Sequence, residues 1–206
     1  KSRFLQSSCF PFLRFYFKDK EPAANAGDHI GDSCLISPRM DVAAFIRARF
    51  LPLAERISRR FGYSTILYAR NGYDAVCVER LDGWHPIQVF LNKTGDRRPL
   101  GMGSATLSIL AAMPEDEAEM ILTHNEQEIR FVLKTDFSAL RGFLTEARRK
   151  GYASAQGMLL EGTIGVSHVL RMGNEAVGSI AIDAVLSEQW DKDQPKIIQE
   201  LQSALS

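Results

Sequence analysis

The sequence lacks three features that would define its class at once: an excess of one charge, a paired set of cysteines and a long apolar run. Its 206 residues carry 25 Lys and Arg against 25 Asp and Glu, so the formal net charge is zero and the chain has no general attraction to nucleic acid or to an anionic membrane. Cys9, Cys34 and Cys77 cannot all pair within the chain and form no CxxC motif, which is typical of a reducing cytoplasm. No segment approaches the roughly 20 apolar residues that a membrane span requires.

Histidine is also scarce, and the four histidines show no metal-binding or catalytic spacing. None pairs with another at helical spacing, so we expect no metal site, no cofactor and no enzymatic activity. Cys77 is expected to be a small buried apolar residue, because no histidine is placed to lower its pKa. His168 is expected to face away from Gly165 by strand alternation. A small cofactor-free enzyme that uses Asp183 with His168 remains an alternative, and it requires both side chains on one face of a pocket.

Residues 1–40 differ from the remainder in composition and are expected to form a separate N-terminal arm. The first 20 residues are basic and aromatic, but Pro11 and Arg14 interrupt the apolar stretch, and four charges follow at 18–21, a pattern that disfavours a secretory signal peptide. The 45% of hydrophobic residues in the whole chain is enough for the core of one large domain, which we place at 41–206.

Hydrophobic periodicity predicts a helix followed by antiparallel strands in the first half of this domain. From Asp41 onward, apolar residues recur at steps of three and four, and Gly62 is a suitable helix end. Strands are predicted at 63–69, 73–81 and 86–91, with Asn71-Gly72 and Asp82-Gly83 as the turns between them.

The second half of the domain reads as helices, then strands, then a final helix. Helices are expected from Ser104, from Pro114 and from Asp136 to the basic triplet at 148–150, with Gly151 after the end. Strands follow at 163–172 and 176–186, and a helix at 197–205. This grouping predicts an α+β fold, an antiparallel sheet with helices on its faces, rather than a parallel βαβ array.

The helix that begins at Ser104 is the best candidate for a ligand site. Gly101 and Gly103 allow close approach of the backbone, and the first N–H groups of the helix have no partner inside the helix. A carboxylate or another anion suits such a position. An ordinary buried helix with a flexible entry explains the same residues.

Several short segments, in this order and spacing, resemble one protein family over residues 30–205. They are 30–35 (Ile-Gly-Asp-Ser-Cys-Leu), 70–72 (Arg-Asn-Gly), 78–80 (Val-Glu-Arg), Gly95, Pro99-Leu100, Ser104-Ala105, Leu110-Ala111, 148–152 (Arg-Arg-Lys-Gly-Tyr) and Gly162. The pattern is similar to the effector-binding domain of the IclR family of bacterial transcription regulators, which has a GAF-like or profilin-like fold. The resemblance implies a small-molecule effector, DNA binding through a winged helix-turn-helix domain, a cytoplasmic homodimer or homotetramer and no membrane contact.

The resemblance also implies a set of effector-binding residues. They are Phe90, Met102, Gly103, Ser104, Ala105, Gly165, Ala181 and Asp183. Small residues at 165 and 181 suggest a roomy cavity for an aromatic acid or a phenol. Asp183 replaces the hydroxyl or thiol groups of relatives that bind small carboxylates, so a hydroxyl or an amine at one end of the ligand suits it better than an anion.

The chain also departs from the family pattern in ways that leave alternatives open. Thr106-Leu107 stands where the family often has Gly-Lys, and 155–157 (Ala-Gln-Gly) stands where acidic residues are usual. Residues 1–31 are too few for a whole DNA-binding domain, so they are either the remnant of a winged helix with its linker or an arm that docks on the body or on a partner. A module that only oligomerises, with its cavity filled by side chains, is the other alternative to a sensor.

Overall fold

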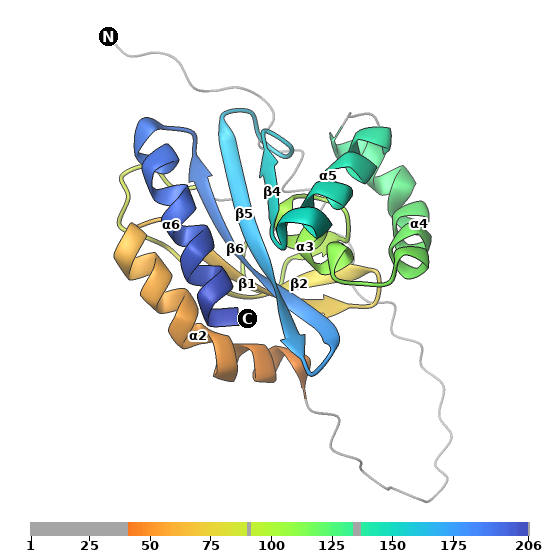
Figure 1. The fold of residues 1–206 in the computed structure, drawn as a ribbon, viewed down its shortest axis with the longest axis horizontal. Helices are drawn as coiled ribbons and strands as arrows, with labels where there is room; N and C mark the ends of the chain where they lie inside the picture. The colour runs from red at the N-terminus through yellow and green to blue at the C-terminus, as the bar shows by residue number, and fades with distance from the viewer. Residues whose placement is uncertain (1–40, 90–91, 134–136, 206) are drawn as a thin grey trace, which may run out of the picture. The chain divides into compact units, whose positions relative to one another are not determined.

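A six-stranded antiparallel sheet in the order β3-β2-β1-β6-β5-β4 organises the domain (Figure 1). The computed structural model describes residues 41–89, 92–133 and 137–205, so the expected arm at 1–40 lies outside the described residues. The strands are β1 (Ser64–Asn71), β2 (Asp74–Leu81), β3 (Arg97–Pro99), β4 (Ala153–Gln156), β5 (Thr163–Met172) and β6 (Glu175–Val185). The expected α+β class is confirmed.

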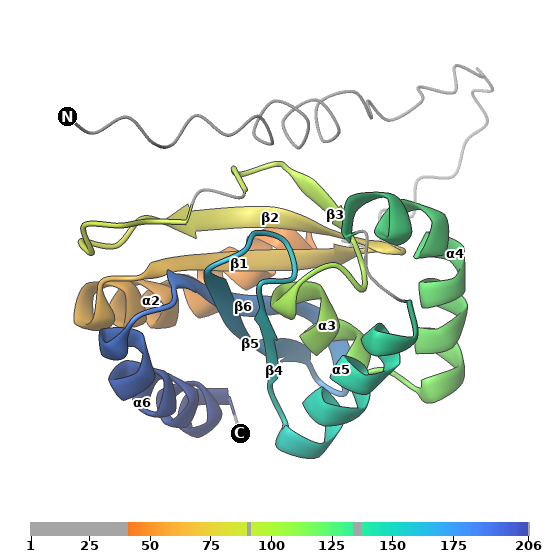
Figure 2. The ribbon, with the colours of Figure 1, turned by 90° about the horizontal axis from the view of Figure 1, so that it is seen from above.

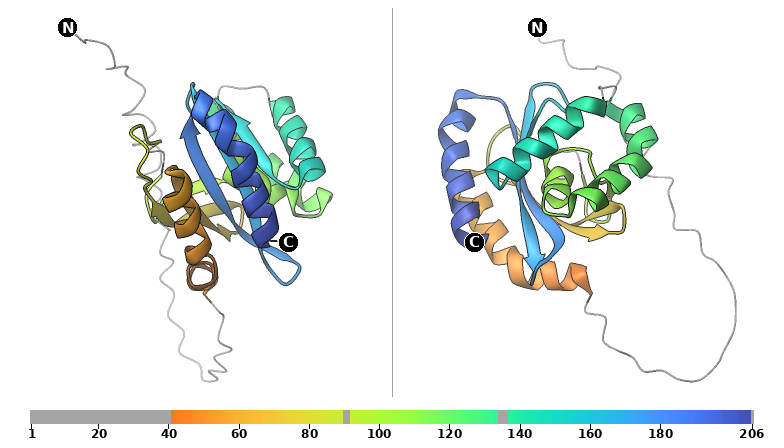
Figure 3. Two further views of the ribbon diagram at one scale, coloured as in Figure 1. Left: turned by 60° about the vertical axis from the view of Figure 1, so that its left-hand side comes forward. Right: turned by 45° about the vertical axis from the view of Figure 1, so that its right-hand side comes forward.

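Helices cover both faces of this sheet, as Figures 2 and 3 show. Helices α2 (Val42–Phe61) and α6 (Glu188–Leu205) lie on one face and contact each other. On the other face, α3 (Ser104–Ala111) packs against β5 and β6, and α5 (Phe137–Lys150) packs against α3 and β4. Helix α4 (Glu115–Leu133) is farther from the middle of the sheet and contacts α5 and β3.

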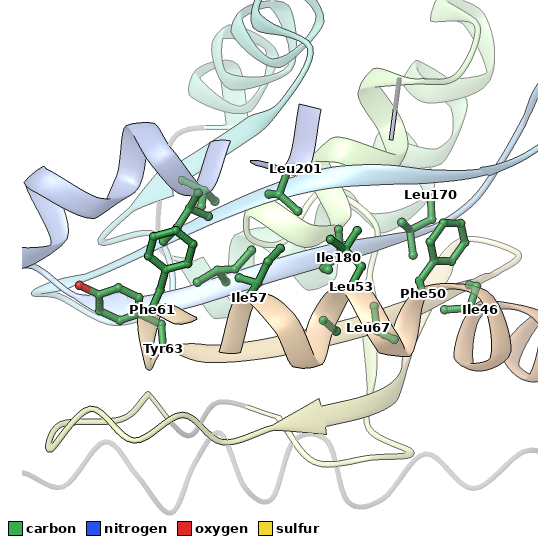
Figure 4. Close-up of a cluster of buried hydrophobic side chains, with 14 of the residues drawn as sticks. Ile46, Phe50, Leu53, Ile57, Phe61, Tyr63, Leu67, Leu170, Ile180 and Leu201 are labelled. Carbon is green, nitrogen blue, oxygen red and sulfur yellow. The ribbon is translucent and has the colours of Figure 1, made fainter. Parts of the chain in front are cut away.

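The main hydrophobic core lies between the sheet and the pair α2 and α6 (Figure 4). Ile57 of α2, Ile180 of β6 and Trp190 of α6 are completely buried there. Full burial of an Ile or Leu side chain stabilises a fold by about 1.5–3 kcal/mol. The apolar stripe that the sequence predicts from position 42 therefore forms one wall of the core.

Local sequence signals set the ends of α2 as expected. The Asp41 carboxylate accepts a hydrogen bond from the main-chain N–H of Ala43, 3.0 Å from N to O, which caps the helix start. Gly62 ends the helix with φ of 80°, a left-handed conformation that glycine adopts at little cost.

The structure differs from the prediction in the strand at 86–91, in two strands that were not predicted, β3 and β4, and in the start of the last helix. The strand predicted at 86–91 is wrong over its described part: residues 86–89 form no strand, and the partner of β2 is β3, with Asp74 opposite Pro99. The Gln88 amide instead donates to the main-chain oxygens of Gly62 and His85, so side-chain bonds hold this loop. Strand β4 was not expected, and α6 begins at residue 188 rather than 197, because Ser187 Oγ accepts the N–H of Trp190.

Along the described part of the chain, no helix combines the length and the apolar composition of a membrane span.

Candidate functional site

Strand alternation turns Ala181 and Asp183 of β6 toward the face of the sheet that α3 covers. Ile180 and Ile182 belong to the core with α2 and α6, so Ala181 and Asp183 point to the opposite face. The register places Asp183 between Gly165 of β5 and Ser64 of β1. The face under α3 therefore carries a carboxyl group beside a residue without a side chain.

The entry of α3 lies directly over this part of the sheet. Gly103 is the N-cap with φ of 92°, and no side chain caps the helix. Ser167 Oγ on β5 donates to the main-chain oxygen of Ser104, 2.7 Å away, which fixes the helix start against the sheet. The N–H of Gly103 donates to the Met158 sulfur at 3.2 Å. A thioether sulfur is a weak acceptor, so this helix start lacks a strong partner for its partial positive charge.

A small cavity lies between the α3 entry, the sheet and the connection from β4 to β5. Its free volume is about 20 Å³, which is room for about one water molecule. It is lined by Tyr68, Val89, Arg98, Gly103, Ser104, Ala105, Ala155, Met158, Leu159, Thr163, Ile164, Gly165 and Asp183.

Two buried polar side chains in the cavity wall have atoms without a hydrogen-bond partner among the described residues. Tyr68 is 1% exposed and its Oη has no partner; burial raises its pKa, so it is a neutral phenol. Arg98 is 3% exposed, and its Nη2 donates to Asn92 Oδ1 at 2.6 Å while its Nε has no partner. A buried polar group without a partner costs about 1–3 kcal/mol, so both atoms mark a place where a ligand or a water would stabilise the protein.

Asp183 contributes a carboxyl group whose charge is disfavoured. Removal from bulk water raises its pKa, and the guanidinium groups of Arg98 and Arg80 oppose this shift. Its Oδ1 and Ser104 Oγ converge over Gly165, because a Cβ at residue 165 would lie 2.7 Å and 2.5 Å from them. Any residue larger than glycine at 165 would displace these two oxygen atoms.

The structure brings most of the residues expected at the site to one place. Gly103, Ser104, Ala105, Gly165 and Asp183 all line the cavity. Met102 and Ala181 are buried nearby in sequence but are not in the cavity wall, and Phe90 lies outside the described residues.

Sequence reasoning missed eight residues of the wall: Tyr68, Val89, Arg98, Ala155, Met158, Leu159, Thr163 and Ile164. The alternation of β1 carried a usable signal for Tyr68, since Leu67 and Ala69 belong to the opposite core. Arg98 belongs to a three-residue strand that was not predicted, and residues 158 and 159 lie in a connection that gave no pattern. Met158 and Leu159 also explain why the open space is smaller than the glycine and alanine positions suggested.

The elements of the alternative enzyme do not meet. His168 pairs with Ile180 on β6, and alternation turns it to the face away from Gly165 and Asp183, as expected. Burial lowers the pKa of His168 and raises the pKa of Cys77 to about 12, so the imidazole is neutral and the thiol is protonated at pH 7. Among residues 41–89, 92–133 and 137–205, no three His, Cys, Asp or Glu side chains gather as a metal site would require.

Comparison with known proteins identifies the class of this domain. Residues 41–205 match the family described as the C-terminal domain of the bacterial transcriptional regulator IclR. The chain therefore belongs to the IclR family of transcription regulators, and this part of it is the effector domain.

Individual relatives agree with this assignment. One relative is the HTH-type transcriptional regulator KipR of Bacillus subtilis, 27% identical over 92 residues, which are 45% of this chain and 35% of that protein. The effector domain of the IclR regulator of Acinetobacter sp. ADP1 has a TM-score of 0.66 and 15% identity, with 79% of this chain and 95% of that chain covered. An IclR homologue of Microbacterium hydrocarbonoxydans, solved with 4-hydroxybenzoate, has a TM-score of 0.63 and 24% identity, with 80% of this chain and 71% of that chain covered. The chain matches about a third of the length of KipR.

Proposed function

We propose that this domain senses a small organic acid or phenol and thereby regulates the DNA binding of the protein that contains it. The effector would bind in the cavity at the entry of α3, with Gly103, Ser104, Ala105, Gly165 and Asp183 among its contacts. The same proposal includes a homodimer or homotetramer in the cytoplasm and a winged-helix domain that binds DNA. Binding energy would shift the relative orientation of subunits.

The observation that carries this proposal is a pair of buried polar atoms, in residues of one cavity wall, that have no hydrogen-bond partner among the described residues. Tyr68 and Arg98, which carry these atoms, line the same cavity as Gly103 and Ser104 at the uncapped start of α3, a position that favours an oxygen ligand. A module that only oligomerises has no need for these groups, and its cavity would be filled by apolar side chains. The complex of one neighbour with 4-hydroxybenzoate supports an aromatic hydroxy acid as one candidate.

The cavity is too small to bind an aromatic effector without a change in its wall. About 20 Å³ does not admit an aromatic ring, so an aromatic effector must displace part of the wall. Met158 and Leu159 are the obvious groups to move, because they belong to the connection 157–162 between β4 and β5 rather than to a strand or a helix. Part of the binding energy would then be used to move this connection.

Nuclear magnetic resonance on the 206-residue chain tests the proposal. Titration with propionate, benzoate, 4-hydroxybenzoate and phenol should shift the amide signals of Gly103, Ser104 and Gly165 in a saturable way. Leu201, in the core on the other face, serves as the control and should not shift. Recovery of unaltered probe from the sample would exclude turnover. The absence of saturable shifts with all four probes, or shifts confined to the α2 and α6 face, would overturn the proposal.

A further inference from the structure

The most informative side chain in the cavity wall is Arg98, which combines complete burial with incomplete pairing. It is 3% exposed, and its one hydrogen bond among the described residues is to the neutral Asn92 amide. No carboxylate of the described residues lies within 4 Å of its guanidinium, whereas the neighbouring Arg97 pairs with Asp74 at 2.9 Å. A buried cation without a counter-ion is destabilising, which makes an anionic partner at this position strongly favourable.

Arg98 reaches the same helix entry that Asp183 faces. A Cβ built on Gly103 would lie 3.1 Å from Arg98 Nη1, so the guanidinium touches the N-cap of α3. Ser104, the next residue, has its Oγ beside the carboxyl of Asp183 above Gly165. The cation and the carboxyl therefore flank two consecutive residues of one helix start, and no ion pair within 4 Å joins them.

We propose, building on the sensor function above, that the effector is bifunctional, with an anionic group that binds Arg98 and a hydrogen-bond donor that binds Asp183. The chemical class is a small hydroxy acid or amino acid. Arg98 and the first N–H groups of α3 bind the carboxylate, and Asp183 with Ser104 Oγ binds the hydroxyl or ammonium group.

Electrostatics favour this class over its monofunctional relatives. A simple acid would pair with Arg98, but it would offer no hydrogen-bond donor to Asp183 and would further disfavour the charge of this buried carboxyl. A simple phenol would satisfy Asp183 but would leave the guanidinium without a counter-ion. A ligand with both groups satisfies both walls, and each charge-assisted hydrogen bond in such a site changes affinity by about tenfold to a hundredfold.

Three probes of nearly the same shape test the proposal on the wild-type chain. We expect isothermal titration to give at least about tenfold tighter binding for 4-hydroxybenzoate than for benzoate or for phenol. This comparison needs no variant and therefore does not depend on how the protein tolerates a substitution. Equal affinities for the three probes would overturn the assignment of two polar ends.

Two substitutions then assign each end of the ligand to its partner. Arg98→Met should weaken 4-hydroxybenzoate and benzoate by about tenfold to a hundredfold and leave phenol unchanged, because the apolar replacement keeps the volume but removes the charge. Asp183→Asn should weaken 4-hydroxybenzoate and phenol but leave benzoate unchanged or tighter. Arg97→Met, one residue away on the same strand with its pair partner outside the cavity, is the matched control and should change no affinity.

The outcomes separate this inference from the sensor function. If the probes bind saturably and both variants, when folded, bind them with wild-type affinity, the bifunctional class is overturned and the sensor function stands. If Arg98→Met does not fold, Arg98→Lys, which keeps the charge, should still bind 4-hydroxybenzoate more tightly than phenol; loss of that preference in a folded Arg98→Lys counts against Arg98. Absence of binding by every probe overturns both proposals together.

Discussion

The main-chain N–H of Gly103 donates a hydrogen bond to the sulfur of Met158, with 3.2 Å between nitrogen and sulfur. This contact joins the entry of α3 to the connection between β4 and β5. It places a weak acceptor where a carboxylate oxygen would bind much more strongly. Met158 also packs on Leu107, Ala147 and Ala153, so its side chain belongs both to the cavity and to a small apolar cluster.

Shortening Met158 should make room for an effector. In Met158→Ala we expect about tenfold tighter binding of 4-hydroxybenzoate, because the ligand no longer displaces the thioether. The same change should lower the free energy of unfolding by about 1 kcal/mol, since this side chain is partly buried. Isothermal titration and urea denaturation measure the two effects. Leu160→Ala, an exposed position in the same connection, should change neither quantity, and weaker binding in Met158→Ala would contradict the idea of a plug.

A methyl group at residue 165 should block the site with limited cost to the fold. Gly165→Ala places a Cβ 2.5 Å from Ser104 Oγ and 2.7 Å from Asp183 Oδ1, and both side chains must move away. We expect a loss of about 1–3 kcal/mol in stability and at least a tenfold loss in effector affinity.

The matched control for this substitution is Gly142→Ala. Gly142 is exposed within α5, and a Cβ there has nothing within 4 Å. We expect this variant to gain about 0.5–1 kcal/mol in stability from the lower backbone entropy of the unfolded chain and to bind effector normally. Normal affinity in Gly165→Ala would show that the effector binds elsewhere.

The raised pKa of Asp183 predicts a pH dependence of stability. A carboxyl whose pKa is higher in the folded state than its ordinary value of 3.8 binds protons more tightly when folded. Its contribution to stability is therefore fully present below pH 3.8 and is lost as the pH rises through the folded pKa. Arg98 and Arg80 face this group and reduce the effect, while burial of Tyr68 and Cys77 keeps both neutral at these pH values.

Urea denaturation between pH 4 and pH 8 measures this effect by difference. Asp183→Asn should lose less stability than the wild-type chain as the pH rises across this range, because it has no proton to release. Parallel curves for the two proteins would mean that Asp183 has the same pKa in the folded and unfolded states.

The core on the other face should affect stability without affecting recognition. Trp190 is completely buried and its ring centroid is 5.0 Å from that of Tyr63, so Trp190→Ala should cost about 3–5 kcal/mol. Trp84 is 67% exposed, and its indole N–H donates to the main-chain oxygen of Arg59. Trp84→Ala should therefore cost the free energy of this hydrogen bond and less than about 1 kcal/mol in addition. Thermal denaturation compares the two variants. A loss of effector affinity in folded Trp190→Ala, larger than in Trp84→Ala, would show that the two faces are coupled.

Local patterns were enough to predict most elements of this fold. Asp41 and Gly62 mark the two ends of α2, because a helix cap and a left-handed turn depend on only a few neighbouring residues. The turn at Asn71-Gly72 and the alternation of β5 and β6 are equally local, and they place Asp183 on the face of the sheet opposite Ile182. The sequence by itself therefore determined the class of fold, the entry of α3 and the family to which the pattern belongs.

The tertiary structure decided which distant side chains meet at that entry. Arg98 comes from a three-residue strand at one edge of the sheet, Tyr68 from β1 and Met158 from the connection after β4. These side chains meet because of the strand order, the strand register and the packing of α3 on the sheet. No short segment of the sequence determines any of these three features. Burial then makes these residues candidates for ligand binding. In water an arginine or a phenol is hydrogen-bonded to solvent, and it lacks a partner only after the fold removes it from water.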